Sequence, residues 1–113
     1  HLLEMCQGRG LAARVDTKGI DLIGAAMEFA RMGVLPAGLY RNRSFAEGSV
    51  DPGETELAVQ DLLFDPQTSG GLLMAVDPAD AESLLNALHG CVPSAQRVGV
   101  LEGYQGGARI CLR

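Results

Sequence analysis

Short helical and strand-like patterns alternate along this chain, and glycine or proline closes most of them. Apolar residues at helical spacing, or in short continuous or alternating runs, predict each element. Because helices and strands interleave, we predict an α+β fold in which helices are layered against one mixed sheet. Helices are expected over residues 1–7, 21–32, 54–64 and 78–89, and strands over 11–15, 72–76, 97–101 and 108–113.

Two of these helices carry signals for their first residues. Asp77 is a favoured N-cap, and Pro78 suits the first helical position, where its missing N–H costs nothing. Asp21 is expected to cap the helix over 21–32 in the same way. Residues 34–53, in contrast, show no period and contain three glycines and two prolines. We therefore expect a long loop there, of the kind that is normally functional or mobile.

The charge balance and the motifs exclude several function classes. The chain has 9 Lys or Arg against 14 Asp or Glu, a net charge of −5, and no dense basic face for duplex nucleic acid. No apolar run reaches the roughly 18 residues of a membrane span. The single lysine, Lys18, lies outside any G-x-x-x-x-G-K-[ST] phosphate loop. A stand-alone nucleotide hydrolase of that type is therefore excluded.

Three widely spaced cysteines give neither a disulfide framework nor a metal pattern. Cys6, Cys91 and Cys111 form no C-x-x-C pair, and unpaired thiols fit a reducing cytoplasm. His89 and Cys91 are close in sequence, but two ligands are too few for a metal site. The first residues read as mid-helix without an initiating Met. We therefore expect residues 1–113 to be a single domain of a longer protein.

The segment DPQTSGG, residues 65–71, joins a predicted helix to a predicted buried strand. Successive backbone N–H groups at glycines can form a concave nest for an anion, and two neighbouring hydroxyls can add donors. The alternative is a tight turn in which Asp65 and Thr68 satisfy local backbone groups. A serine-hydrolase elbow does not fit, because Gln67 occupies the position where G-x-S-x-G needs glycine.

A second segment, GVLPAG at residues 33–38, is followed by Arg41 and Asn42. The guanidinium of Arg41 is able to hold a phosphate or carboxylate through two parallel N–H bonds. The alternative is a solvated surface arginine, which is the common role of this residue type.

Together these segments resemble the selenophosphate synthetase (selenide, water dikinase) family. The run DPQTSGGLL, residues 65–73, is similar to the signature of that family, and residues 33–42 are similar to its G-x-x-P-x-G-x-x-R-N stretch. The opening HLLEM resembles the segment after the family's T-G-F-G-L-x-G motif. Order and spacing agree across nearly the whole chain.

The resemblance implies the C-terminal domain of such an enzyme, with the layered mixed sheet of aminoimidazole ribonucleotide synthetase-like proteins. Family members make selenophosphate from selenide, ATP and water, release AMP and phosphate, need Mg²⁺ and usually act as cytoplasmic dimers. Their reactive Cys or selenocysteine, essential Lys and most metal-binding Asp residues belong to the N-terminal domain. We therefore expect no catalytic or metal residue here, no cofactor bound to this piece alone, and no activity without the N-terminal domain, which brings ATP and selenide.

The resemblance also implies which residues face the phosphate or the product. We expect them to form one wall of a cleft, with Asp65 bracing the loop. The alternative is that both segments only brace the contact between domains. Two other functions stay open: a small-molecule-binding or regulatory α+β module, and a related enzyme of the superfamily with another substrate. The expected wall consists of Arg41, Asn42, Gln67, Thr68, Ser69, Gly70 and Gly71.

Overall fold

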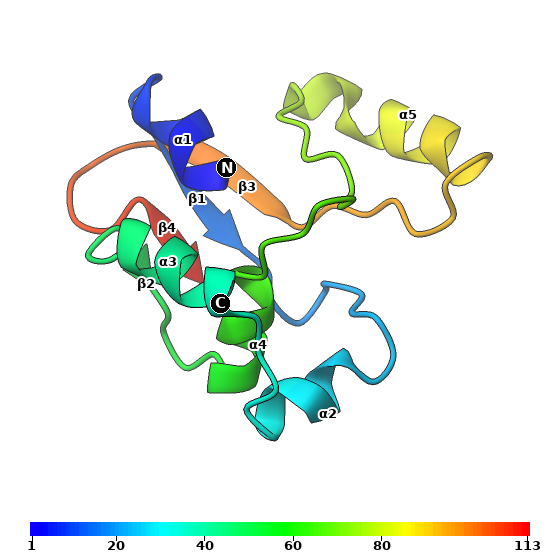
Figure 1. Cartoon of the computed structure of the whole chain (residues 1–113). Coiled ribbons are helices and arrows are strands. Elements are labelled where there is room, and N and C mark those ends of the chain that lie inside the picture. The colour runs from blue at the N-terminus through cyan, green and yellow to red at the C-terminus, as the bar shows by residue number, and fades with distance from the viewer.

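A four-stranded mixed sheet in the order β2-β4-β1-β3 organises the computed structural model, which describes all of residues 1–113 (Figure 1). β1 (Leu11–Val15) pairs antiparallel with β3 (Gly99–Gly103). β4 (Ile110–Leu112) runs parallel to β1 on one side and to β2 (Val50–Asp51) on the other. The predicted α+β class with one mixed sheet is confirmed.

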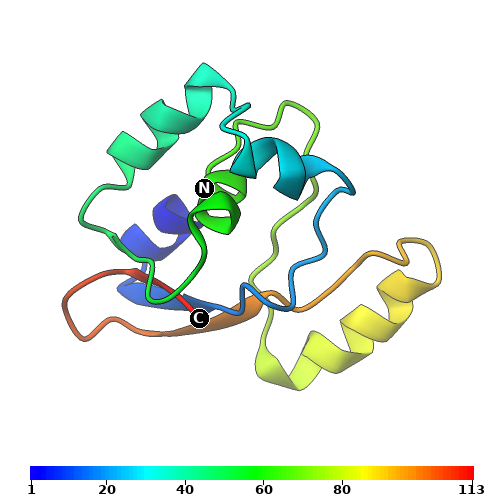
Figure 2. The ribbon, with the colours of Figure 1, turned by 90° about the horizontal axis from the view of Figure 1, so that it is seen from below.

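Four of the five helices lie on one side of this sheet, and α5 lies apart, beyond the β3 edge (Figure 2). The core between sheet and helices is small and centres on α1, Ala46 just after α3, and the inward side chains of β1 and β4. None of the helices combines the length and apolar character that a bilayer crossing requires. The helices are α1 (Leu2–Gln7), α2 (Ala26–Arg31), α3 (Ala37–Phe45), α4 (Leu57–Leu63) and α5 (Pro78–His89).

Side-chain alternation decides which face of the sheet is dry. Ala13 and Val15 of β1 and Ile110 and Leu112 of β4 belong to the buried cluster, whereas Arg14 between the first two is exposed. The predicted final strand is confirmed but shorter than the expected 108–113, since β4 covers Ile110–Leu112, and Cys111 on its other face is half-buried. The close pairing of β1 and β3 requires a residue without a side chain at one point. A Cβ on Gly99 would collide with the carbonyl oxygen of Arg14.

Residue patterns within each segment predicted the bounds of α1, β1 and α5 well. At the start of α5, the Asp77 carboxylate accepts a hydrogen bond from the backbone N–H of Ala79 at 2.9 Å, and Pro78 is the first helical residue. The apolar stripe of α5 is only half-buried, and none of its residues is fully covered. The predicted start of β3 is wrong by two residues, because the strand covers Gly99–Gly103.

The helix predicted over residues 21–32 is too long. It begins after Ala25 rather than at Asp21, and Ile23 is 81% exposed instead of packing on the helix stripe. Gly24 lies within the predicted range, and glycine weakens a helix because it loses the most backbone entropy on ordering. The end was predicted correctly: Gly33 adopts φ +74°, the left-handed conformation that glycine accepts most easily.

The loop predicted over residues 34–53 is also wrong. It contains the nine residues of α3 and the short strand β2. Pro36 precedes α3 in an extended conformation, and Leu39 anchors the helix as a fully buried side chain. The other side chains of α3 are mostly polar or exposed, so no apolar period reveals the helix in the sequence. The next helix is shorter than the predicted 54–64, since α4 covers Leu57–Leu63.

The buried strand predicted over residues 72–76 is absent. These residues form no ladder and are exposed, with Leu72 at 83%. Both sides of the central strand β1 are already occupied, by β3 and β4. A short apolar run does not reveal by itself whether it is buried, because periodicity carries no information in such a run.

Candidate functional site

The two segments singled out in the sequence meet at the first turn of α3. A Cβ on Gly38 would lie 2.8 Å from Cγ of Pro66, inside normal van der Waals contact. Only glycine therefore lets the helix approach the loop this closely without a shift. The Gly38–Pro66 contact fixes the start of α3 beside the beginning of the 65–71 segment.

Asn42 makes a second link between α3 and the chain that leads into the 65–71 segment. Its Nδ2 donates a hydrogen bond of 2.9 Å to the backbone carbonyl of Phe64. This hydrogen bond satisfies one of the backbone carbonyls that the end of α4 leaves without a partner inside the helix. The amide nitrogen of Asn42 is thus used inside the chain, while its Oδ1 makes no hydrogen bond.

Arg43 and Asp61 make the third link, and the sequence patterns did not reveal it. The Arg43 guanidinium forms an ion pair with the Asp61 carboxylate and lies over the Phe64 ring, 5.4 Å from its centroid. Asp61 is 6% exposed and is the one buried charged residue of the chain. A signal for it was available, because Asp61 lies three residues after buried Ala58, on the covered face of α4. A charge on such a face needs a partner.

Arg41 lies one position before Asn42 and differs from Asn42 and Arg43, which are both tied to the α4 region. Its side chain is exposed and makes no hydrogen bond or ion pair with the rest of the chain. Its Nη2 lies 3.6 Å from the place that a Gly38 Cβ would occupy, so the guanidinium folds back toward the Gly38–Pro66 contact. An uncommitted cation therefore lies where the two segments meet.

The 65–71 segment is open along its second half. Gln67 donates its backbone N–H to the carbonyl of Asp65 at 2.9 Å, and Asp65 donates its own to Leu62 at 3.3 Å. Past Gln67, the backbone N–H groups of residues 68–71 have no backbone acceptor, and all four residues are exposed. Neither Asp65 nor Thr68 uses its side chain to satisfy local backbone groups. The donors of residues 68–71 are therefore free for an external acceptor.

The two glycines of this segment have different surroundings. A Cβ on Gly70 would lie 2.7 Å from Oε1 of Gln67, the end of a flexible side chain, whereas a Cβ on Gly71 would meet open space. Neither glycine has a positive φ. The surroundings of Gly71 within this chain therefore do not require a glycine.

The strongest pKa shifts lie outside this region. Arg31 holds Glu56 through two bonds, of 2.8 and 3.0 Å, and these hydrogen bonds lower the pKa of Glu56 and raise that of Arg31. The pair links α2 to the start of α4. Burial raises the pKa of the Cys6 thiol, which leaves it inert in the core. No three His, Cys, Asp or Glu side chains come together as metal ligands would.

Comparison with known proteins decides the family. The model of the "AIR synthase related protein, C-terminal domain" family matches residues 1–111, almost the whole chain.

The chain belongs to this family.

Three relatives of this AIR synthase related domain are named as selenide, water dikinases. A protein of Treponema denticola called "Selenide, water dikinase" is 47% identical over 88 residues, which cover 78% of this chain and 25% of that protein. Its namesake in Clostridioides difficile is 43% identical over 86 residues, 75% of this chain and 25% of the relative. "Selenide, water dikinase 2" of Peptoclostridium acidaminophilum is 37% identical over 98 residues, 87% of this chain and 28% of the relative.

These likenesses confirm the resemblance inferred from residues 33–42 and 65–73. They also confirm the expected fold, that of an AIR synthase related C-terminal domain. The chain spans about a quarter of the length of the relatives it matches. The domain therefore carries only part of whatever machinery the longer relatives possess.

Proposed function

We propose that this chain is the C-terminal domain of a selenide, water dikinase and supplies one wall of its phosphate-binding cleft. The observation that carries the proposal is the free donor set beside the Gly38–Pro66 contact: the unpaired N–H groups of residues 68–71 and the uncommitted Arg41. The longer relatives of this sequence bear that enzyme's name.

The chemistry of the reaction fits such donors. Conversion of selenide, ATP and water into selenophosphate, AMP and phosphate moves phosphoryl groups whose oxygens carry the charge of the transition state. Fixed N–H groups aimed at such oxygens stabilise the charge where it develops, and need no reorganisation. The two parallel N–H groups of the Arg41 guanidinium add charge-assisted hydrogen bonds. Within this wall, Thr68, Ser69, Gly70 and Gly71 bind phosphate oxygens together with Arg41.

The remaining residues of the expected wall position it. Asn42 binds the Phe64 carbonyl, and Asp65 and Gln67 form the backbone turn that leads into the open stretch. Asp65 braces the loop through its backbone. The side-chain oxygen of Asn42 and the side-chain amide of Gln67 remain available to a ligand. As the family resemblance implies, Mg²⁺, ATP and selenide are held by the rest of the protein.

The partner of this wall is the N-terminal domain of the same polypeptide. The domain described here is inactive without it, and the complete enzyme is a cytoplasmic homodimer. The exposed side of the 65–71 segment faces the cleft between the two domains.

Arg41→Ala in the complete enzyme is expected to lower kcat/KM for ATP about 30-fold, because a charge-assisted hydrogen bond contributes about 2 kcal/mol. AMP release and selenophosphate yield are the readouts. Arg41→Lys keeps the charge without the fork and should recover part of the loss. Arg9→Ala removes another exposed arginine, one without an ion pair, and should have no effect. Unchanged turnover in Arg41→Ala would remove Arg41 from the wall.

A further inference from the structure

The face of the sheet opposite the core carries an unusual share of the positive charge. In register, Arg14 of β1 lies beside Cys111 of β4, and Arg109 and Arg113 are two positions to either side on the same face. With Arg97, just before β3, four of the eight arginines of an acidic chain belong to this region. No helix of the group α1–α4 covers this face (Figure 2).

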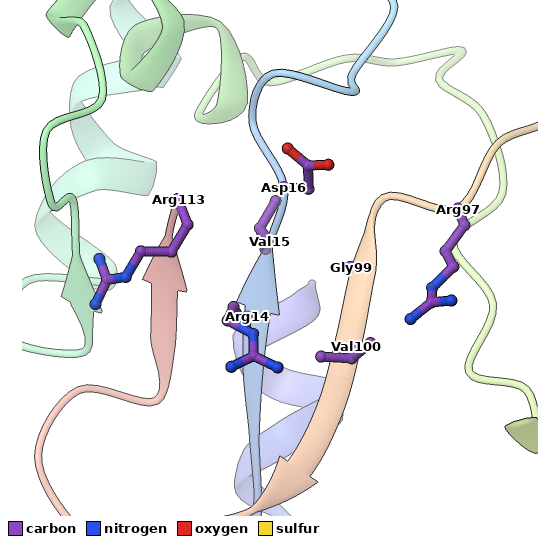
Figure 3. Close-up of a pocket in the computed structure, with 7 residues that line it drawn as sticks. All are labelled: Arg14, Val15, Asp16, Arg97, Gly99, Val100 and Arg113. Atoms are coloured by element: carbon purple, nitrogen blue, oxygen red, sulfur yellow. The ribbon is translucent and has the colours of Figure 1, made fainter.

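An open depression of about 480 Å³ lies at one end of this face, where β1 and β4 end and β3 begins (Figure 3). Arg14, Arg97 and Arg113 line it together with Asp16 and Gly99. Figure 3 shows Arg97 reaching toward β3 from outside the sheet, with Val100 between it and Arg14. No residue of the 65–71 segment lines the depression, and neither does Arg41 or Asn42. It is therefore a different place from the wall described above.

The arginines of the depression differ in how far they are already paired. Arg113 Nη2 donates to the Asp51 carboxylate at 2.7 Å, and this hydrogen bond lowers the pKa of Asp51. Arg14 lies 3.9 Å from Glu102, too far for a hydrogen bond. Arg97 makes no hydrogen bond or ion pair. Arg97 is thus unpaired, and Arg14 is held only by a loose ion pair with Glu102, so both guanidinium groups keep N–H donors for an external partner.

The remaining groups around the depression limit what that partner is. Oδ1 of Asp16 accepts from the backbone N–H groups of Lys18 and Gly19, at 3.2 and 3.3 Å, so its charge is partly satisfied within the turn. β3 is an edge strand, and its outward N–H groups have no strand partner on the side where Arg97 lies. Two guanidinium forks and an unpaired strand edge offer donors to several oxygens at once.

We propose that Arg14 and Arg97 bind a doubly charged oxyanion of the phosphate type at this depression. A carboxylate has two oxygens and is satisfied by one fork, whereas a phosphate dianion presents enough oxygens for both guanidinium groups and an edge N–H. The inference goes beyond the proposed function, because it concerns the opposite face of the sheet and none of the wall residues.

Titration of the 113-residue chain with inorganic phosphate, followed by amide chemical shifts, tests the proposal. Saturable shifts are expected around Gly99 and Asp16, with a dissociation constant in the millimolar range or below. Arg14→Gln and Arg97→Gln should each raise that constant about tenfold, as expected for loss of a charge-assisted bond. Arg9→Gln is the matched surface control and should leave the constant unchanged. The constant is read from the amides around Asp16 and Gly99, so that binding at the 65–71 wall does not enter it.

AMP and acetate complete the design. AMP carries the same phosphate dianion as part of a nucleotide. If AMP binds as tightly as phosphate, the ligand is free phosphate, and if AMP binds more tightly, the ligand is a nucleotide. Both results support the site. Acetate should give no saturable shift. The proposal is overturned if phosphate gives no saturable shift at the Asp16 and Gly99 amides, if that shift survives in the Arg14→Gln/Arg97→Gln double variant with a native-like spectrum, or if acetate shifts these amides at the same concentrations as phosphate.

Discussion

Arg43→Met is expected to lower the free energy of unfolding by about 3 kcal/mol, measured by chemical denaturation. The substitution removes the ion-pair partner of Asp61, a residue that is 6% exposed. An uncompensated buried charge is costly because water no longer solvates it. Met preserves much of the apolar contact with Phe64, so the loss reports the missing charge more than missing volume.

A second substitution distinguishes this cause from a general loss of packing. Arg43→Met/Asp61→Leu removes both charges and should recover most of the stability, because an apolar pair replaces a buried ion pair at little net cost. Arg41→Met on the same helix removes an exposed arginine and should change stability by less than about 0.5 kcal/mol. A loss of less than about 1 kcal/mol in Arg43→Met would show that Asp61 does not depend on Arg43.

Leu39→Ala is expected to cost about 3 kcal/mol of unfolding free energy, within the usual range for a buried leucine. Leu39 is completely buried and is the only residue of α3 itself that is fully covered. Its truncation leaves a cavity beneath the helix that presents Arg41 and Asn42. We therefore also expect faster amide hydrogen exchange along α3 than in the wild type, because local opening becomes easier.

Phe45→Ala is the control on the same helix. Phe45 is 64% exposed, so removing its ring should cost less than about 1 kcal/mol. Equal losses in Leu39→Ala and Phe45→Ala would contradict the burial pattern on which the placement of α3 rests.

The parts of the fold that were predictable have local causes. The Asp77 cap and Pro78 located the start of α5 to the residue, and alternation located the buried positions of the last strand. α3 was not predictable in this way, since its stability depends on one buried leucine and on a buried ion pair with α4. Such partners are distant in sequence, and no periodicity reveals them.

The same distinction holds for the candidate site. The sequence pointed to residues 33–42 and 65–71 as two parts of one wall, and the structure places them in contact at Gly38 and Pro66. It did not reveal that Asn42 is tied to the Phe64 carbonyl or that Arg43 pairs with Asp61. Both are side-chain contacts between residues 22 and 18 positions apart in the sequence, from α3 to α4 or its C-terminal end. The pattern of polar residues was visible, but their partners depend on tertiary packing.

The most direct test of the central claim is to map the backbone amide shifts of the complete enzyme as it is titrated with phosphate in the presence of AMP. We predict that the amides of residues 68–71 shift together and saturate, and that Arg41→Ala weakens this response about tenfold. Saturating shifts elsewhere in the enzyme, with the amides of residues 68–71 unmoved, would contradict the assignment of this segment as a phosphate-binding wall.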